Sequence, residues 1–414
     1  EVRNQKMKIS WFLFICLIVQ FAIALSENPK RIYTQVLFRH GARAPSNSLS
    51  DPAYLANFPR GLGELTDRGF ENSFRLGRFL KTRYVDSKFV DGNLKPRQMY
   101  WRSVNKNRCL SSASTVGAAM FEDPSRHLYV PVLTEEIGEN LLNYDQANCP
   151  RELELIKEKC PDFGGSFHPW TIYEEFIANC LKYTHPVFKQ YPFHTIEAHI
   201  NEYKNGIPLP PLIAQHINEI MGIYVNVTQF ITGTGNHHDP RMMKVKFGNL
   251  MNTLLTDIKN KIYMDKEEKH KSDGRVSRRE KLAVYSTQDW ILMGVLDSLN
   301  VLEQTVGLDK YPEYNSMIIF ETWKDNGKYF VKVFYKKEEI TAEDHELIDV
   351  TKFVRNCKRE RCLAQDFLDC CDDYRNKGEA ESCEASDLKI RTTRSSPPNN
   401  IRRDLHVSEF SGPE

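Results

Sequence analysis

The chain has 414 residues, of which 41% are hydrophobic and 27% are charged. This composition is typical of a globular protein and excludes the disordered and fibrous classes. The formal net charge is only +1, so neither nucleic acid nor an anionic membrane is expected as the main partner. The length allows two domains, or one large domain with an insertion.

Residues 1–26 have the layout of a secretory signal peptide with upstream residues. Lys6 and Lys8 precede an apolar run at residues 11–25, which ends in the small residues Ala22, Ala24 and Ser26. A membrane anchor is the alternative, but this run is shorter than the ~20 apolar residues that a spanning helix needs. We find no second apolar run of spanning length, and we therefore expect a secreted or lysosomal protein.

The segment at residues 27–139 alternates predicted strands and helices. Thr66 can cap a helix whose buried face recurs at three- and four-residue steps up to Tyr84. The other predicted elements are strands at 32–38, 97–103 and 129–133, and a helix at 107–121. Such alternation predicts an α/β fold with a mostly parallel sheet flanked by helices.

Residues 140–266 differ, because their pattern is mostly helical and is broken by prolines such as Pro208 and Pro210. We interpret them as a smaller, mainly helical second domain, a cap or insertion. The α/β pattern returns at 267–390, with a strand at 282–286, a helix at 290–299, and strands at 317–323 and 329–335. Asn326-Gly327 between the last two strands indicates a hairpin. The polar tail at 391–414 is expected to be disordered.

The cysteines and one sequon agree with an oxidising compartment. Of the ten cysteines, Cys16 falls in the signal peptide, and the odd number that remains leaves at least one free or paired between chains. Zinc binding is the alternative, but Cys357 and Cys362 have no matching pair at zinc spacing, so no metal is expected. Asn226, in Asn-Val-Thr, is a candidate glycosylation site.

Polar residues follow three predicted strands at the point where each strand ends. Residues 39–45 follow the first strand, Arg102-Ser103 ends the second, and Gln288-Asp289 follows the strand at 282–286. In open α/β sheets, ligands bind outside the carboxyl ends of the strands. The three segments are therefore predicted to share one crevice.

The residue types in this crevice point to phosphate-ester chemistry without a cofactor. Arg39, Arg43 and Arg102 carry planar guanidinium groups that match phosphate oxygens. A neutral His40 could attack phosphorus and form a phosphohistidine. Asp289 could then give a proton to the leaving alcohol as general acid. The predicted partner is a small phosphate ester or a phosphoprotein.

The run Arg39-His40-Gly41-x-Arg43-x-Pro45 resembles the signature of the histidine acid phosphatases, the secreted branch of the histidine phosphatase superfamily. Residues 61–66, 76–80, 102–113 and 317–335 resemble further segments of this family. The resemblance implies that His40 is the nucleophile, that Arg39, Arg43 and Arg102 bind phosphate, and that Asp289 is the proton donor. It also implies an α/β domain with a smaller helical domain.

Two disulfides are expected, and the resemblance supports the first of them, since the family has a short-range pair near this position. A short-range bridge is expected between Cys357 and Cys362, which are also close in sequence. Cys149 is expected to join a cysteine after Cys370, with Cys383 as the candidate.

One position departs from the family, which carries His-Asp where this chain has Gln288-Asp289. The Gln288 amide can donate a hydrogen bond to phosphate but cannot carry charge. An active acid phosphatase is therefore the main hypothesis, and a weak or inactive pseudo-phosphatase that binds phosphate esters is the alternative. A mutase-like transferase is disfavoured by the signal peptide and the cysteines. His238-Asp239 supplies the missing dipeptide in letters, but it follows no predicted strand and is interpreted as a solvated loop.

Overall fold

The computed structural model describes residues 28–376 except for 47, 135–140, 143–148, 163–178, 184–186, 188–189, 192, 269–279 and 338–345. The predicted signal peptide, the residue Cys383 and the tail at 391–414 lie outside the described residues. None of the helices within the described ranges combines the length and the apolar character that crossing a membrane requires.

The described strands form one eight-stranded sheet in the order β3-β2-β4-β1-β5-β6-β7, with β8 also paired to β6. Strands β1 to β4 run parallel to one another, and β5 is antiparallel to β1. Because β6 is antiparallel to β5, it runs with β1, whereas β7 and β8 run the other way. The predicted mostly parallel sheet is therefore confirmed, as a mixed sheet. The strands are β1 (Lys30–Arg39), β2 (Met99–Ser103), β3 (Leu133–Thr134), β4 (Leu282–Thr287), β5 (Met317–Asp325), β6 (Lys328–Lys336), β7 (Ile348–Asp349) and β8 (Cys362–Leu363).

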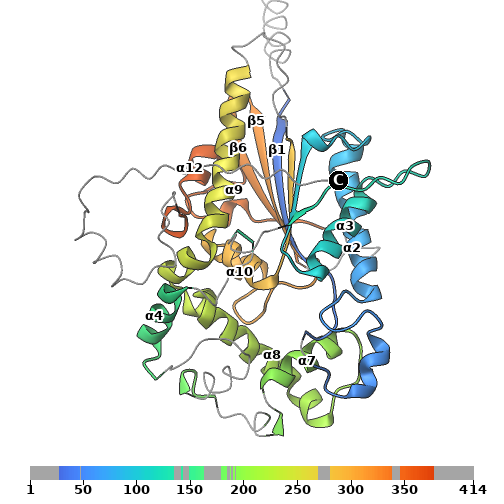
Figure 1. Ribbon diagram of the computed structural model, residues 1–414. Coiled ribbons are helices and arrows are strands. Elements are labelled where there is room, and N and C mark those ends of the chain that lie inside the picture. Colours follow the sequence, from blue (N-terminus) through green and yellow to red (C-terminus); the bar gives the residue numbers. More distant parts are fainter. Residues whose placement is uncertain are drawn as a thin grey trace, which may run out of the picture.

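Helices cover both faces of the sheet (Figure 1). Helices α2 and α3 share a buried cluster with Val36, Trp101 and Val284 on one face, while α9 and α10 pack with Tyr285 and Phe320 on the other. The helices are α2 (Asp67–Leu80), α3 (Asn107–Met120), α4 (Pro150–Lys159), α7 (Phe193–Lys204), α8 (Pro211–Thr232), α9 (Pro240–Glu268), α10 (Asp289–Ser298), α11 (Leu302–Thr305) and α12 (Ala364–Leu368), with short turns η1 (Pro52–Asn57), η2 (Lys81–Asp86), η3 (Pro96–Gln98), η5 (Gly235–His237), η6 (Thr351–Phe353) and η7 (Asp372–Tyr374).

A third buried cluster lies among the helices of the middle region. It joins residues of α4, α7 and α8 such as Leu155, Ile196 and Ile220, and these helices lie below the sheet in Figure 1. Helix α9 contributes to two clusters, because Met242 packs with the helical group and Leu254 packs against the sheet. The division into an α/β domain and a helical domain at 140–266 stays a prediction.

Local signals in the sequence explain several element boundaries. The side chain of Thr66 accepts a hydrogen bond from the backbone of Gly69 and begins α2, as predicted. Asn326 and Gly327 have φ values of 46° and 77°, the left-handed pair that a tight hairpin turn needs. The strand predicted at 129–133 is wrong in its bounds. Tyr129 is exposed, and only Leu133 and Thr134 pair with the end of β2, because β3 is the edge strand.

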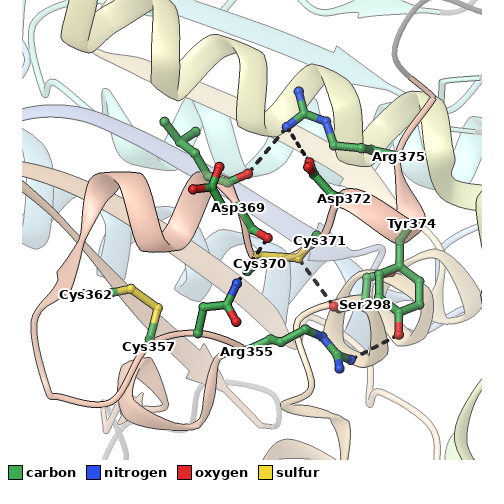
Figure 2. The surroundings of a disulfide bond; sticks show 12 residues. Ser298, Arg355, Cys357, Cys362, Asp369, Cys370, Cys371, Asp372, Tyr374 and Arg375 are labelled. Atoms are coloured by element: carbon green, nitrogen blue, oxygen red, sulfur yellow. Dashed lines mark hydrogen bonds and ion pairs between the residues drawn. A yellow bond between two sulfur atoms is a disulfide. The ribbon is translucent and has the colours of Figure 1, made fainter.

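Three disulfides join pairs of cysteines within the described residues, and Figure 2 shows the surroundings of one of them. Cys160 pairs with Cys180, the expected short bridge joins Cys357 to Cys362, and the adjacent Cys370 and Cys371 form the third bond. Cys149 is also disulfide-bonded. Cys109 is a free thiol, and burial raises its pKa to about 12.

Two other sequence features make defined side-chain contacts, although His238 itself is exposed, in the segment between η5 and α9. His238 bonds to Asp297 and to the Tyr374 hydroxyl, both at 2.9 Å, so it is held away from the strand ends. Asn226 lies within α8, where its amide donates to the Tyr183 hydroxyl and its carbonyl lies 2.9 Å from His237. A glycan on Asn226 would have to replace both contacts, and its attachment stays a prediction.

Candidate active site

The three polar segments meet at the carboxyl edge of the parallel strands. Arg39 at the end of β1 lies level with Thr287 at the end of β4, and Ser103 at the end of β2 lies level with Ser286. The backbone N–H of His40 also donates to the Thr287 carbonyl at 3.0 Å. The predicted shared crevice therefore has its structural basis in the parallel register of β1, β2 and β4.

Close contact with α2 fixes the loop that follows β1. The Ala42 carbonyl accepts from the backbone N–H of Thr66, and a Cβ on Gly69 would lie only 2.1 Å from that carbonyl oxygen. A Cβ on Gly41 would lie 2.5 Å from the Gly69 carbonyl oxygen. Glycine at these two positions lets the loop and the helix touch, and this contact sets the position of His40.

The hydrogen bonds of His40 define its tautomer. Its Nδ1 lies 2.8 Å from the Gly41 carbonyl, which can only accept, so Nδ1 carries the proton. The Nε of Arg108 donates to His40 Nε2 at 3.2 Å, so Nε2 holds the lone pair. Burial, and then the charges of Arg108, Arg39 and Arg43, lower the pKa of His40 well below its ordinary value. The imidazole is thus held neutral, with its lone pair on Nε2.

Arg108 is the arginine of the second segment that reaches this site. It lies in the first turn of α3, where it donates from Nε to His40 and from Nη2 to Gln288 Oε1 at 3.0 Å. The sequence interpretation chose Arg102 instead, and the geometry corrects it. Arg102 lies inside β2 and donates from Nη1 to the Tyr100 hydroxyl at 3.2 Å, on the face of the sheet that also carries Tyr285.

The buried Arg39 and the partly exposed Asp289 form an ion pair at the same edge. Arg39 Nη2 lies 2.8 Å from Asp289 Oδ2, and its Nη1 donates to the Pro312 carbonyl. The other oxygen of Asp289 accepts from the backbone N–H of Trp290 at 2.8 Å, at the start of α10. The carboxyl group therefore has a fixed orientation at the N-terminus of α10.

Arg43 is held by a residue that no local motif indicated. Its Nη1 lies 2.7 Å from Glu197 Oε1, and both side chains are almost fully buried. Glu197 lies on α7 and also accepts from Asn201 and from the backbone of Ser46. Tyr314 completes the network by donating to Asn201. A carboxylate from the helical region thus orients one guanidinium of the site.

The arrangement brings together Arg39, His40, Arg43, Gln288 and Asp289 as predicted, and it adds Arg108 and Glu197. Three guanidinium groups around a neutral imidazole form a cradle for a dianion. Within the described residues, no cluster of three His, Cys, Asp or Glu side chains has the geometry to hold a metal ion.

Comparison with known proteins places this geometry in a family. Residues 32–205 and 186–336 match the family model of the Histidine phosphatase superfamily (branch 2). The chain belongs to this superfamily. The matched residues include the loop after β1, the start of α3, and Gln288-Asp289 at the start of α10.

Curated members of the superfamily resemble this chain over most of its length. It is 28% identical over 390 residues to "Putative acid phosphatase 1" of Caenorhabditis elegans, covering 92% of this chain and 87% of the relative. It is 27% identical to the prostatic acid phosphatase of Homo sapiens over 327 residues, covering 74% of this chain and 77% of the relative. The solved phytase of Klebsiella sp. ASR1 has the same fold, with a TM-score of 0.56, 14% identity, and coverage of 86% of this chain and 98% of the phytase.

Proposed function

We propose that this protein is an acid phosphatase that hydrolyses phosphate monoesters through a phosphohistidine on His40. Family membership and the named relatives support phosphate monoester hydrolysis. The observation that carries the mechanism is the state of His40. Its Nδ1 proton is bound to the Gly41 carbonyl, and Nε2 faces the guanidinium of Arg108 with its lone pair free of a proton.

The first step follows from this placement. A phosphate dianion bound by Arg39, Arg43 and Arg108 would present phosphorus to Nε2 of His40. The Nε2–phosphorus bond forms while the bond to the ester oxygen breaks, and the cations stabilise the charge on the transferring group. A protonated Asp289 gives its proton to the leaving oxygen, which departs as the alcohol.

In the second step, the same carboxylate takes a proton from water, which attacks the phosphohistidine and releases inorganic phosphate. His40 regains its lone pair, so each cycle consumes one water. No cofactor enters either step. A phosphoprotein and a small phosphate ester are both proposed as substrates of this chemistry, and a secreted or lysosomal location is likewise a proposal.

The test is His40→Ala with an aryl phosphate as substrate. We expect turnover to be abolished, and we expect quenched wild-type reactions to carry an acid-labile phosphoryl group on the peptide that contains His40. His216→Ala is the control, because His216 is half-buried on α8, where it pairs with Glu219. Full activity in His40→Ala would refute the mechanism. A wild-type protein that binds vanadate but never turns over would establish the pseudo-phosphatase alternative.

A further inference from the structure

A lysine that the proposed mechanism does not use lies beside the site. Lys204 is the last residue of α7, and its Nζ lies 4.7 Å from the ring centre of Tyr311 and 5.6 Å from that of Tyr314. It forms an ion pair with Glu313, and its side chain is only 13% exposed. The cation is therefore held in place rather than free in solvent.

Lys204 shares its aromatic support with the phosphate-binding site. The guanidinium of Arg39 lies over the same two rings, 5.3 Å from the centre of Tyr311 and 4.1 Å from that of Tyr314. Burial lowers the pKa of Lys204, and the charge of Arg39 lowers it further, whereas the carboxylates of Glu313 and Asp289 act in the opposite direction. Lys204 is thus close enough to interact electrostatically with both members of the Arg39–Asp289 pair.

The side on which Lys204 lies determines what it could bind. In the proposed mechanism, Asp289 protonates the leaving oxygen, so the alcohol part of the substrate leaves beside Asp289. The three arginines surround the phosphoryl group instead. Lys204 lies over the same two rings as Arg39, the arginine that pairs with Asp289, so this cation would lie on the side of the alcohol part.

We propose that Lys204 is a second anion-binding subsite, which selects phosphate monoesters whose alcohol part carries a further carboxylate or phosphate. Glu313 occupies this subsite until the anionic group of the substrate displaces it. The inference rests on the proposed function, since it places the leaving group at Asp289. The competing explanation is that the Lys204–Glu313 pair only fastens the end of α7 to the segment before β5.

A matched pair of substrates separates these explanations. Phenyl phosphate and 4-carboxyphenyl phosphate differ only in the anion on the leaving group. We expect Lys204→Met to lower the ratio of their kcat/KM values, carboxylated over neutral, by about three- to tenfold, the effect of one partly buried charge pair. Glu313→Gln should raise the same ratio by a similar factor, because it removes the internal competitor.

The control is Lys310→Met, which removes a lysine charge from an exposed position in the segment before β5 that also carries Glu313. It should leave the ratio at the wild-type value. Raising the salt concentration should reduce the ratio in the wild type more than in Lys204→Met, because salt screens the interaction. A ratio that is the same in the wild type and in Lys204→Met overturns the subsite, whatever the stability of either variant.

A binding measurement keeps this test independent of turnover. Phenylphosphonate and 4-carboxyphenylphosphonate have a carbon–phosphorus bond in place of the ester linkage and are not hydrolysed, so calorimetry gives their relative affinities for each variant. If the protein has no turnover but Lys204→Met still lowers the affinity ratio, the proposed function fails and the subsite stands. If turnover occurs and neither ratio changes, the subsite fails and the function stands. If neither phosphonate binds, both are refuted.

Discussion

Arg108 contacts the proposed nucleophile and Gln288 at once, and this double contact makes it the most informative side chain of the site. Arg108→Met removes a donor aimed at the reacting centre, so we expect kcat/KM to fall by about 10²–10³. Arg102→Met is the matched control, and it should cost far less, because Arg102 donates to the Tyr100 hydroxyl. Steady-state kinetics on one aryl phosphate measures both, and a larger loss in the Arg102 variant would reverse the assignment.

The lowered pKa of His40 predicts where activity is lost in acid. Only the neutral imidazole can attack, so the limb of the pH–rate profile that reports His40 should lie well below pH 6.5. Arg108→Met removes the largest charge that disfavours imidazolium, so this limb should move to higher pH. The lowered pKa of folded His40 also reduces the stability of the protein in acid. Below about pH 6.5, His40 binds a proton in the unfolded chain but not in the folded one, so the free energy of unfolding decreases as the pH falls toward the pKa of folded His40. An acidic limb that does not move in the variant would contradict this assignment.

Gln288 is the position at which this chain departs from the family pattern, and it holds Arg108 through its amide oxygen. We expect Gln288→His to lower the activation barrier by about 1–4 kcal/mol and so to raise turnover, mostly at acidic pH, because a protonated histidine adds a charged donor for phosphate. Gln288→Leu should lower kcat/KM, since Arg108 loses an acceptor. If the pH–rate profiles of the wild type and Gln288→His superimpose, Gln288 does not limit the reaction.

The site residues that the sequence could predict share one property, namely that each follows or ends a strand within a short motif. Arg39, His40, Arg43 and Asp289 were found in this way. Arg102 was misassigned because strand alternation turns its side chain to the sheet face, whereas the helix that begins at Asn107 turns Arg108 toward His40. The beginning of that helix was itself predicted, and it was the available signal. Glu197 gave none, since it lies on a distant helix and its role depends on the tertiary contact with Arg43.

At the scale of elements, the contact between α2 and the loop after β1 controls the site. Gly69→Ala would place a methyl group against the Ala42 carbonyl, so α2 or the loop must shift. We expect a loss of about 1–3 kcal/mol in the free energy of unfolding, together with lower kcat, because His40 is in the displaced loop. Gly222→Ala is the control. It lies in α8 with no atom within 4 Å of the added Cβ, and it should be neutral or stabilising by up to about 1 kcal/mol. Denaturant unfolding and kinetics together decide the matter, and unchanged activity in Gly69→Ala would show that the loop is positioned by other contacts.

Elements with strong periodicity or a defined cap were predictable, and an element held only by its neighbour was not. Helix α2 has both its Thr66 cap and its buried face, and the β5–β6 hairpin has its Asn326-Gly327 turn. The edge strand β3 has neither. Its two residues are exposed and join the sheet only through pairing with Arg102 and Ser103, which no local sequence signal specifies.

At the scale of the whole molecule, the helical cluster and the sheet are joined by shared elements. Tyr224 of α8 packs against both the helical cluster and the core beside the sheet, and α9 contributes residues to each. Elements that belong to two cores favour cooperative unfolding. The molecule is therefore expected to unfold in a single thermal transition, even though α4, α7 and α8 lie below the sheet in Figure 1.

The disulfides test this coupling. The bridge between Cys160 and Cys180 closes a loop with a sequence separation of 20 in the helical region, and in the chain-entropy model it stabilises the fold by about 3 kcal/mol. Cys160→Ser combined with Cys180→Ser should lower the midpoint of the single transition by roughly 5 °C. The matched pair Cys357→Ser with Cys362→Ser opens a loop with a separation of 5 beside the sheet, so a smaller decrease of the same transition is expected. Differential scanning calorimetry distinguishes the outcomes. The contrary outcome is a separate low-temperature transition after Cys160→Ser with Cys180→Ser, while Cys357→Ser with Cys362→Ser moves only the main transition. The helical region would then unfold independently, and the shared elements would not couple it to the sheet.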